Sequence, residues 1–396
     1  MARMIAILLA LFCLCQAEDI PSSSVPELIR YWGYTVEEHT VITEDGYILG
    51  MHRIPFGREG SYGDGVSRPP VFLAHGLTSS SSQWVFGPPN KALGYMLADA
   101  GYDVWMGNTR GNTYSKAHVS LDTCSRCKEF WSFGFDETGV HDYSAEIDHI
   151  LDTTGFEKLR FVGHSMGGTQ YMILLSERPE YNDKIQEGYL LAPAVFMTYA
   201  PHPVFIFSSL GNTIEDLVHL LGMYELVPES EFVHWLAQIM CDQITDTLPG
   251  LCDNFAFAFC GINPAQFNET MASVYLDMVP AGTSTRPIVH YAQLHMTELA
   301  FQKFDFGKKE NEATYGSPTP PAYDLSNVKT PVAIWVGDKD YLVDIQDVDH
   351  LVSMLPNVKL YETVDIPGFT HLDFATAIDA DKAVYAKIIE KMNDGI

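Results

Sequence analysis

The stretch Leu159-Arg160-Phe161-Val162-Gly163-His164-Ser165-Met166-Gly167 decides the fold class of this 396-residue chain. It joins a short β-rich run to the pattern G-x-S-x-G, and a helix-like run from Thr169 to Glu177 follows. A serine on a tight strand-to-helix turn exposes its hydroxyl above a sheet, and the flanking glycines are needed because a β-carbon there would clash. The pattern therefore predicts Ser165 as a nucleophile at the end of a buried strand.

Short apolar runs alternate with helix-like runs on both sides of this stretch. Two strands are expected around the turn Glu44-Asp45-Gly46, and the other predicted strands cover 70–74, 102–106, 331–336 and 358–364. Helices are expected over 90–100, 141–153 and 348–355. Because buried strands separated by helices are typical of a parallel, doubly wound sheet, the predicted fold class is α/β.

Composition and charge exclude several classes of protein. With 46% hydrophobic and only 19% charged residues, the chain has enough apolar side chains for a packed core, which excludes general disorder. Acidic residues outnumber basic ones by 51 to 24, so the formal net charge is −27 at neutral pH. Since no basic cluster interrupts this excess, we expect no binding to nucleic acid or to an anionic membrane through charge.

Residues 1–17 predict the compartment. Arg3 gives a positive start, an apolar run extends from Met4 to Cys15, and Ala17 is the small residue that a signal peptidase requires. This run is too short to span a membrane, and no later segment reaches the roughly 18 apolar residues of a spanning helix. We therefore expect a cleaved signal peptide, entry into the secretory route and no transmembrane segment.

The strand rhythm is lost between Ala194 and about Pro321. This part is aromatic and helix-like, and it ends in the turn-rich run Gly316-Ser317-Pro318-Thr319-Pro320-Pro321. We interpret it as an insertion folded over the sheet. The predicted organisation is a core in two parts, 18–194 and 322–396, with a cap formed by 195–321.

A serine hydroxyl is a weak nucleophile, so it needs a base and a carboxylate that orients the base. His371 and Asp340 both follow the last predicted strands, at the carboxyl ends where ligands bind in such sheets. His350 is a rival base, although it lies inside a helical run. The competing carboxylates are Asp338, Asp344 and Asp347, whose simpler interpretation is a solvated loop or helix-capping carboxylate. Sequence position alone leaves Asp338 open as the acid.

Negative charge on the oxygen of a tetrahedral intermediate must be met by backbone amides. One donor is expected from Met166, directly after the nucleophile, and a second from Leu77, in the loop after an early strand. His75 and His164 flank these turns, and their simpler interpretation is a hydrogen bond to the backbone.

The cysteines suit an oxidising route. Beyond residue 17 they number five, which allows at most two disulfides and one free thiol. A local disulfide is the favoured interpretation of Cys124 and Cys127, because a zinc site would need two further ligands and no second C-x-x-C exists. One glycosylation sequon begins at Asn268.

Several blocks far apart in the chain carry a resemblance to a known family. They are Tyr31-Trp32-Gly33-Tyr34, Thr43-Glu44-Asp45-Gly46-Tyr47-Ile48-Leu49, His52-Arg53-Ile54-Pro55, His75-Gly76-Leu77, Gly107-Asn108-Thr109-Arg110-Gly111-Asn112, the run from Asn263 to Ser284, and His371-Leu372-Asp373-Phe374. The chain resembles the gastric, lingual and lysosomal acid lipases of the α/β-hydrolase class over nearly its whole length beyond residue 17.

The resemblance implies roles for individual residues. It implies Ser165 as nucleophile, His371 as base and Asp340, the fourth residue of Gly337-Asp338-Lys339-Asp340, as acid. It also implies a lid within the cap, a disulfide between Cys241 and Cys252, and a free thiol at Cys260. Two features depart from the family pattern: Met166 replaces the usual Gln, and the pair Cys124 and Cys127 is unfamiliar there.

The sequence therefore predicts a secreted or lysosomal hydrolase of long-chain fatty acid esters, either triacylglycerols or sterol esters, acting through an acyl-enzyme. We expect no cofactor and no metal. An acidic chain cannot reach an oil droplet by charge, so we expect docking through apolar residues of the insertion, such as Phe232, Trp235 and Leu236. The alternatives are a soluble carboxylesterase or peptidase of the same fold, and a catalytically silent lipid carrier.

Overall fold

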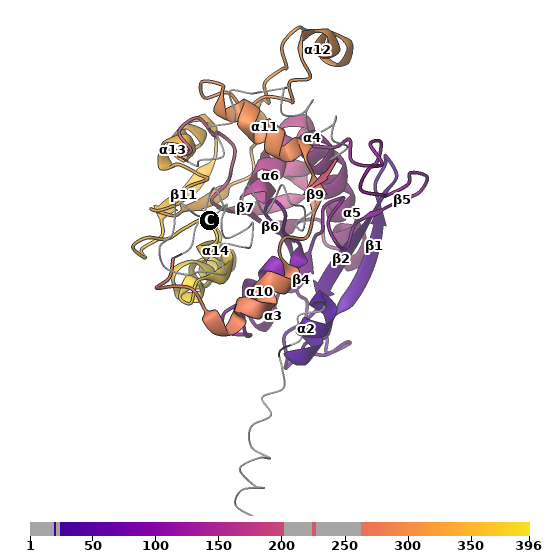
Figure 1. Cartoon of the computed structure of the whole chain (residues 1–396). Coiled ribbons are helices and arrows are strands. Elements are labelled where there is room, and N and C mark those ends of the chain that lie inside the picture. The colour runs from indigo at the N-terminus through magenta and orange to yellow at the C-terminus, as the bar shows by residue number, and fades with distance from the viewer. Residues whose placement is uncertain (1–19, 21–23, 202–223, 227–262) are drawn as a thin grey trace, which may run out of the picture.

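A mixed β-sheet forms the centre of the computed structural model, which describes residues 20, 24–201, 224–226 and 263–396 (Figure 1). The strands of this sheet are β1 (Glu37–Ile42), β2 (Tyr47–Ile54), β3 (Pro70–Ala74), β4 (Asp103–Met106), β5 (Ala117–His118), β6 (Leu159–His164), β7 (Ile185–Leu191), β10 (Val332–Val336) and β11 (Val358–Thr363). Their order is β1-β2-β4-β3-β6-β7-β10-β11, and β5 pairs with β2 outside this path. From β4 to β11 all neighbours are parallel, whereas β2 is antiparallel to β1, β4 and β5.

The α/β fold class predicted from the sequence is confirmed, and so are the seven predicted strands. The pattern did not indicate β7, whose sequence mixes apolar residues with Gln186, Glu187 and Gly188. Gly188 is required there because a β-carbon would lie 2.6 Å from the hydroxyl oxygen of Tyr171. Apolar periodicity is a poor guide to a strand in which close packing selects a glycine.

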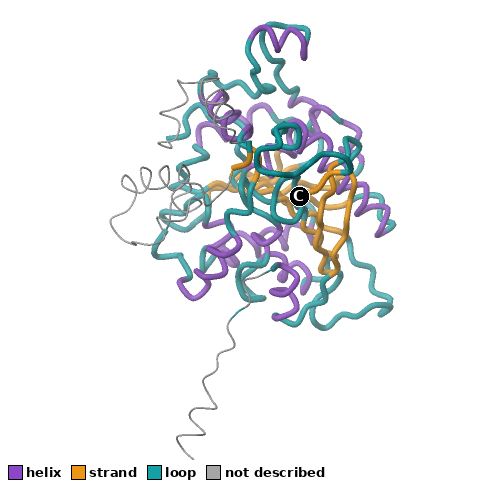
Figure 2. Tube along the Cα trace, turned by 45° about the vertical axis from the view of Figure 1, so that its right-hand side comes forward, coloured by secondary structure: helices purple, strands orange, loops and turns teal. Residues whose placement is uncertain are grey.

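Helices cover both faces of the sheet, as the complete burial of β3, β4 and β10 requires (Figure 2). The α-helices of the described ranges are α2 (Val25–Tyr31), α3 (Leu93–Asp99), α4 (Phe135–Glu137), α5 (Tyr143–Thr154), α6 (Met166–Glu177), α10 (Ala272–Met278), α11 (Arg286–His295), α12 (Lys308–Tyr315), α13 (Ile345–Met354), α14 (Asp373–Thr376) and α15 (Ala386–Asp394). None of the helices in the described ranges is long and apolar enough to cross a bilayer.

The insertion lies between two strands that are neighbours in the sheet. β7 pairs directly with β10, although residues 192–331 separate them in the chain. The described part of this crossover holds α10, α11, the projecting α12, and a small sheet of β8 (Glu225–Leu226) and β9 (Thr283–Ser284) (Figure 1). The boundaries 18–194, 195–321 and 322–396 stay predictions. Phe232, Trp235 and Leu236 lie outside the described residues, as does the signal peptide.

Candidate active site

Ser165 sits on a sharp turn between β6 and α6. Its backbone has φ 56° and ψ −117°, a region that non-glycine residues rarely adopt and that stores strain at functional sites. The flanking glycines let the chain pass through this turn. A β-carbon on Gly163 would lie 2.9 Å from the carbonyl carbon of Gly167, and one on Gly167 would lie 2.5 Å from the carbonyl oxygen of Ala74. The sequence pattern is therefore accounted for by local packing around Ser165.

Asp340 and His371 form a buried pair at the carboxyl ends of β10 and β11. The Nδ1 atom of His371 lies 2.7 Å from Oδ2 of Asp340, and the two side chains are 2% and 0% exposed. The other carboxylate oxygen, Oδ1, accepts hydrogen bonds from the amides of Leu342 (2.8 Å) and Val343 (2.9 Å). Because Asp340 engages Nδ1, the Nε2 atom of His371 is the nitrogen left to accept a proton.

Asp338 acts on the loop that carries His371. It is exposed, and its carboxylate accepts hydrogen bonds from the amides of Gly368 (3.1 Å) and Phe369 (2.8 Å). In this structure Asp340, and not Asp338, contacts the imidazole. The solvated-loop interpretation of Asp338 missed its bonds to the histidine loop, because the sequence does not show that residues 338 and 368 meet.

The other candidates lie elsewhere. Asp344 caps α13 by accepting a hydrogen bond from the amide of Gln346 (2.8 Å), as expected of a capping carboxylate. Asp347 is 1% exposed and accepts hydrogen bonds from the amides of Thr198 and Tyr199, so it is neither a solvated loop carboxylate nor a helix cap. His350 is on α13, where its ring packs against Phe196 with centroids 4.6 Å apart.

His164 contacts His371 directly. Its Nε2 atom donates to the carbonyl oxygen of His371 (3.0 Å), and the two ring centroids are 4.8 Å apart. Burial holds the pKa of His164 well below its ordinary value, so the ring is neutral at the pH of most assays. This neutral ring puts no second positive charge beside His371.

A second carboxyl follows His371. Asp373 is 3% exposed, and its Oδ2 accepts a hydrogen bond from the amide of Thr370 (2.7 Å). Burial, assisted by the nearby charge of Asp340, raises the pKa of Asp373 to about 7. Asp373 is therefore protonated in acid solution. Sequence reasoning found no role for it.

The two expected oxyanion donors lie close to the serine turn. Met166 opens α6, where backbone N–H groups have no partner inside the helix. A β-carbon on Gly76 would lie 3.3 Å from Cβ of Ser165, so the loop that continues into Leu77 passes close to the nucleophile. The amide of Leu77 has no hydrogen-bond partner within the described ranges. A carbonyl oxygen held above Ser165 would have two free amides available to it.

The remaining predicted sites have different outcomes. Cys124 and Cys127 form the local disulfide that the sequence favoured. Asn268 caps a short turn, with its Oδ1 accepting from the amide and the hydroxyl of Thr270, and its glycosylation stays a prediction. Cys241, Cys252 and Cys260 lie outside the described residues.

Comparison with known proteins gives matches along almost the whole chain. Residues 25–87 match a family model described as a partial alpha/beta-hydrolase lipase region, and residues 69–377 match one described as the alpha/beta hydrolase fold. The chain is 40% identical over 371 residues to a lysosomal acid lipase/cholesteryl ester hydrolase of Macaca fascicularis, covering 93% of this chain and 90% of that one. It is 40% identical over 370 residues to a gastric triacylglycerol lipase of Rattus norvegicus, covering 93% and 91%.

A solved structure agrees with the fold. The thermophilic esterase from Thermogutta terrifontis aligns over 90% of this chain and 98% of its own, with a TM-score of 0.50 and 14% sequence identity. At this identity the likeness supports the architecture and nothing finer.

Proposed function

Because this chain belongs to the acid lipase family of the α/β-hydrolases, we propose that it hydrolyses carboxylic esters of long-chain fatty acids with Ser165 as nucleophile. The observation that carries the proposal is the buried pair of Asp340 and His371, 2.7 Å apart, beside the strained turn of Ser165. A carboxylate, an imidazole and a serine hydroxyl in this order are the machinery of acyl transfer.

The reaction runs through an acyl-enzyme. The Oγ atom of Ser165 attacks the ester carbonyl while Nε2 of His371 takes its proton. Asp340 keeps the imidazole in the tautomer with Nδ1 protonated and stabilises the imidazolium. The amides of Leu77 and Met166 donate to the oxyanion, and His371 then passes its proton to the leaving alcohol. Water repeats the cycle and releases the fatty acid.

The substrate class is supported by the relatives' names. One is named for triacylglycerol and the other for cholesteryl ester, so both substrates are candidates here. Such esters form droplets, and a chain with net charge −27 has to approach a droplet through apolar contacts. We extend the proposal to action at an oil–water interface. After loss of residues 1–17, the protein acts in a secreted or lysosomal setting.

Assays on purified protein test the proposal. Triolein and cholesteryl oleate emulsions are compared from pH 4 to 8 with the dissolved ester p-nitrophenyl butyrate and with a peptide amide. A lipase turns over at least one emulsion well above the Ser165→Ala background. Turnover of the dissolved ester alone indicates a soluble carboxylesterase, turnover of the amide indicates a peptidase, and lipid binding without turnover of any substrate indicates a carrier.

A further inference from the structure

The peptide group between Gly76 and Leu77 is held in place by hydrogen bonds to its carbonyl oxygen. Nδ1 of His75 lies 2.8 Å from the carbonyl oxygen of Gly76, which also accepts from the amide of Ser79 (3.2 Å). In a trans peptide the C=O and the following N–H point in opposite directions. Fixing the Gly76 oxygen therefore fixes the direction of the Leu77 N–H, the proposed oxyanion donor.

The hydrogen bonds of His75 determine its tautomer. Its Nε2 atom accepts from the amide of Thr109 (3.2 Å) and faces the side-chain nitrogen of Asn112 (3.3 Å). A nitrogen that accepts carries no hydrogen, so the proton is on Nδ1 and points at Gly76. The side chain is 2% exposed, and burial lowers its pKa to about 4, which keeps the ring neutral above that pH.

A buried polar network holds the loop that faces His75. In loop 107–112, the backbone amide of Asn108 donates to the carboxylate of Glu146 (3.0 Å). The side-chain oxygen Oδ1 of Asn108 accepts from the backbone amide of Ser81 (2.8 Å). Asn112 also donates to Oδ1 of Asn108 (3.0 Å). The loop is thus tied to a helix, to a neighbouring loop and to itself.

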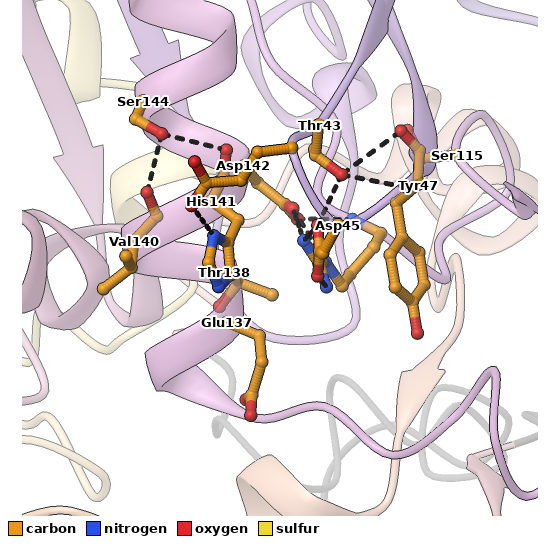
Figure 3. Close-up of polar contacts among 12 residues, drawn as sticks. Thr43, Asp45, Tyr47, Ser115, Glu137, Thr138, Val140, His141, Asp142 and Ser144 are labelled. Atoms are coloured by element: carbon orange, nitrogen blue, oxygen red, sulfur yellow. Dashed lines mark hydrogen bonds and ion pairs between the residues drawn. The ribbon is translucent and has the colours of Figure 1, made fainter. Parts of the chain in front are cut away.

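Arg110 anchors the same loop with charge. It is 1% exposed and forms ion pairs of 2.6 Å with Asp45 and with Asp142, while its guanidinium lies 3.8 Å from the ring centroid of Tyr47. Figure 3 places Asp45 and Tyr47 beside the helical turn that carries Asp142. The backbone amide of Arg110 also donates to Asp142 (2.9 Å). Both the side chain and the backbone of Arg110 are therefore held, and this backbone directly follows Thr109. Backbone that is this constrained is a rigid support for His75.

We propose that His75 is a positioning residue for the oxyanion site, which holds the Gly76–Leu77 peptide so that the Leu77 N–H meets the transition state. The inference rests on the proposed function and adds a role to a side chain outside the triad. Loop 107–112, with Arg110 as its anchor, supplies the rigid partner of His75. The effect belongs to the transition state, because the donor is aimed at charge that develops only there.

Two polar substitutions separate the two hydrogen bonds of His75. His75→Asn places an amide nitrogen near the position of Nδ1 and retains the bond to Gly76, whereas His75→Gln reaches the position of Nε2 and retains only the bond to Thr109. On dissolved p-nitrophenyl butyrate, we expect kcat of His75→Gln to fall roughly 10²- to 10³-fold, about the value of one oxyanion donor, with KM changed much less. His75→Asn should recover most of this loss.

A second readout distinguishes positioning from general packing. The affinity for an alkylboronic acid, a tetrahedral analogue of the transition state, should weaken in His75→Gln by a factor similar to the loss of kcat/KM, and should stay close to that of the unmodified enzyme in His75→Asn. Equal or higher kcat in the Gln variant, or an unchanged boronate affinity in it, would overturn the inference.

Asn112→Ala keeps the test decisive if His75→Gln does not fold. Loss of one hydrogen bond to Nε2 should lower kcat about three- to tenfold and weaken the boronate in parallel; no change in either quantity would contradict the role of His75. Failure of the proposed function is distinct, because the unmodified protein would then not hydrolyse p-nitrophenyl butyrate or emulsified ester.

Discussion

Two pairs of loops lie around the turn of Ser165, and different interactions hold them in place. The loops after β10 and β11 carry the side chains proposed to react, and carboxylates order them: Asp340 binds His371, and Asp338 binds the two loop amides that precede this histidine. The loops after β3 and β4 offer a backbone amide, and a neutral histidine, His75, orders it. In the first pair, carboxylates act directly on the histidine and its loop. In the second pair, His75 acts through neutral hydrogen bonds, and the charge of Arg110 only anchors the loop that His75 contacts.

This difference predicts how each side responds to mutation. A substitution on the acid–base side can remove a reacting group outright. On the oxyanion side only Leu77→Pro would remove the N–H donor itself, whereas the other substitutions can only misplace it, so their effects should be graded. The predictions below test this contrast, beginning with the largest effect.

The largest losses should come from the reacting side chains. Ser165→Ala and His371→Ala should each reduce kcat by about 10⁶, because nucleophile and base act as one unit. For the same reason, the double variant should be little slower than either single variant. Kinetics on p-nitrophenyl butyrate check this, and losses that multiply in the double variant would show that the two residues act independently.

Asp340 and Asp338 form a matched pair of carboxylates. Asp340→Asn should lower kcat/KM by about 10³ to 10⁴, since Asn favours the wrong tautomer of the histidine. Asp338→Asn retains an oxygen for the amide of Phe369 and should cost about tenfold or less, the scale of one hydrogen bond. Measured on the same ester, the reverse ranking would mean that the carboxylates exchange roles in solution.

The last expected effect concerns stability and not rate, and it lies on the acid–base side. The carboxyl of Asp373 has its pKa raised to about 7 by burial, so the folded state prefers the protonated form. A raised carboxyl pKa gives stability that is present in acid and is lost as the pH rises toward 7 and above. Between pH 5 and 8 this loss amounts to about 2 to 3 kcal/mol.

Asp373→Asn should remove this dependence, because Asn stays neutral and keeps an oxygen for the Thr370 amide. In urea unfolding, the excess of the variant's free energy of unfolding over that of the unmodified protein should grow by about 2 to 3 kcal/mol from pH 5 to pH 8. A variant that is less stable at both pH values would show that the negative charge of Asp373 is needed.

The same contrast explains how much the sequence could predict. Ser165, His371 and Asp340 could be proposed from the sequence because a side chain that reacts has a recognisable type and a recognisable place after a strand. The role of His75 was not found, since its partners Thr109 and Asn112 are more than 30 residues away and only the folded chain brings them together. The strand β7 was missed for a similar reason, because the glycine at position 188 is selected by a tertiary contact with Tyr171.

One measurement tests the central claim most directly. A long-chain p-nitrophenyl phosphonate should react with the protein once, release one equivalent of p-nitrophenol, and leave an adduct on the peptide that contains Ser165. Activity toward emulsified ester should fall in proportion to the adduct, and the Ser165→Ala variant should not react. An adduct on another residue that abolishes activity, or full activity with Ser165 occupied, would contradict the account.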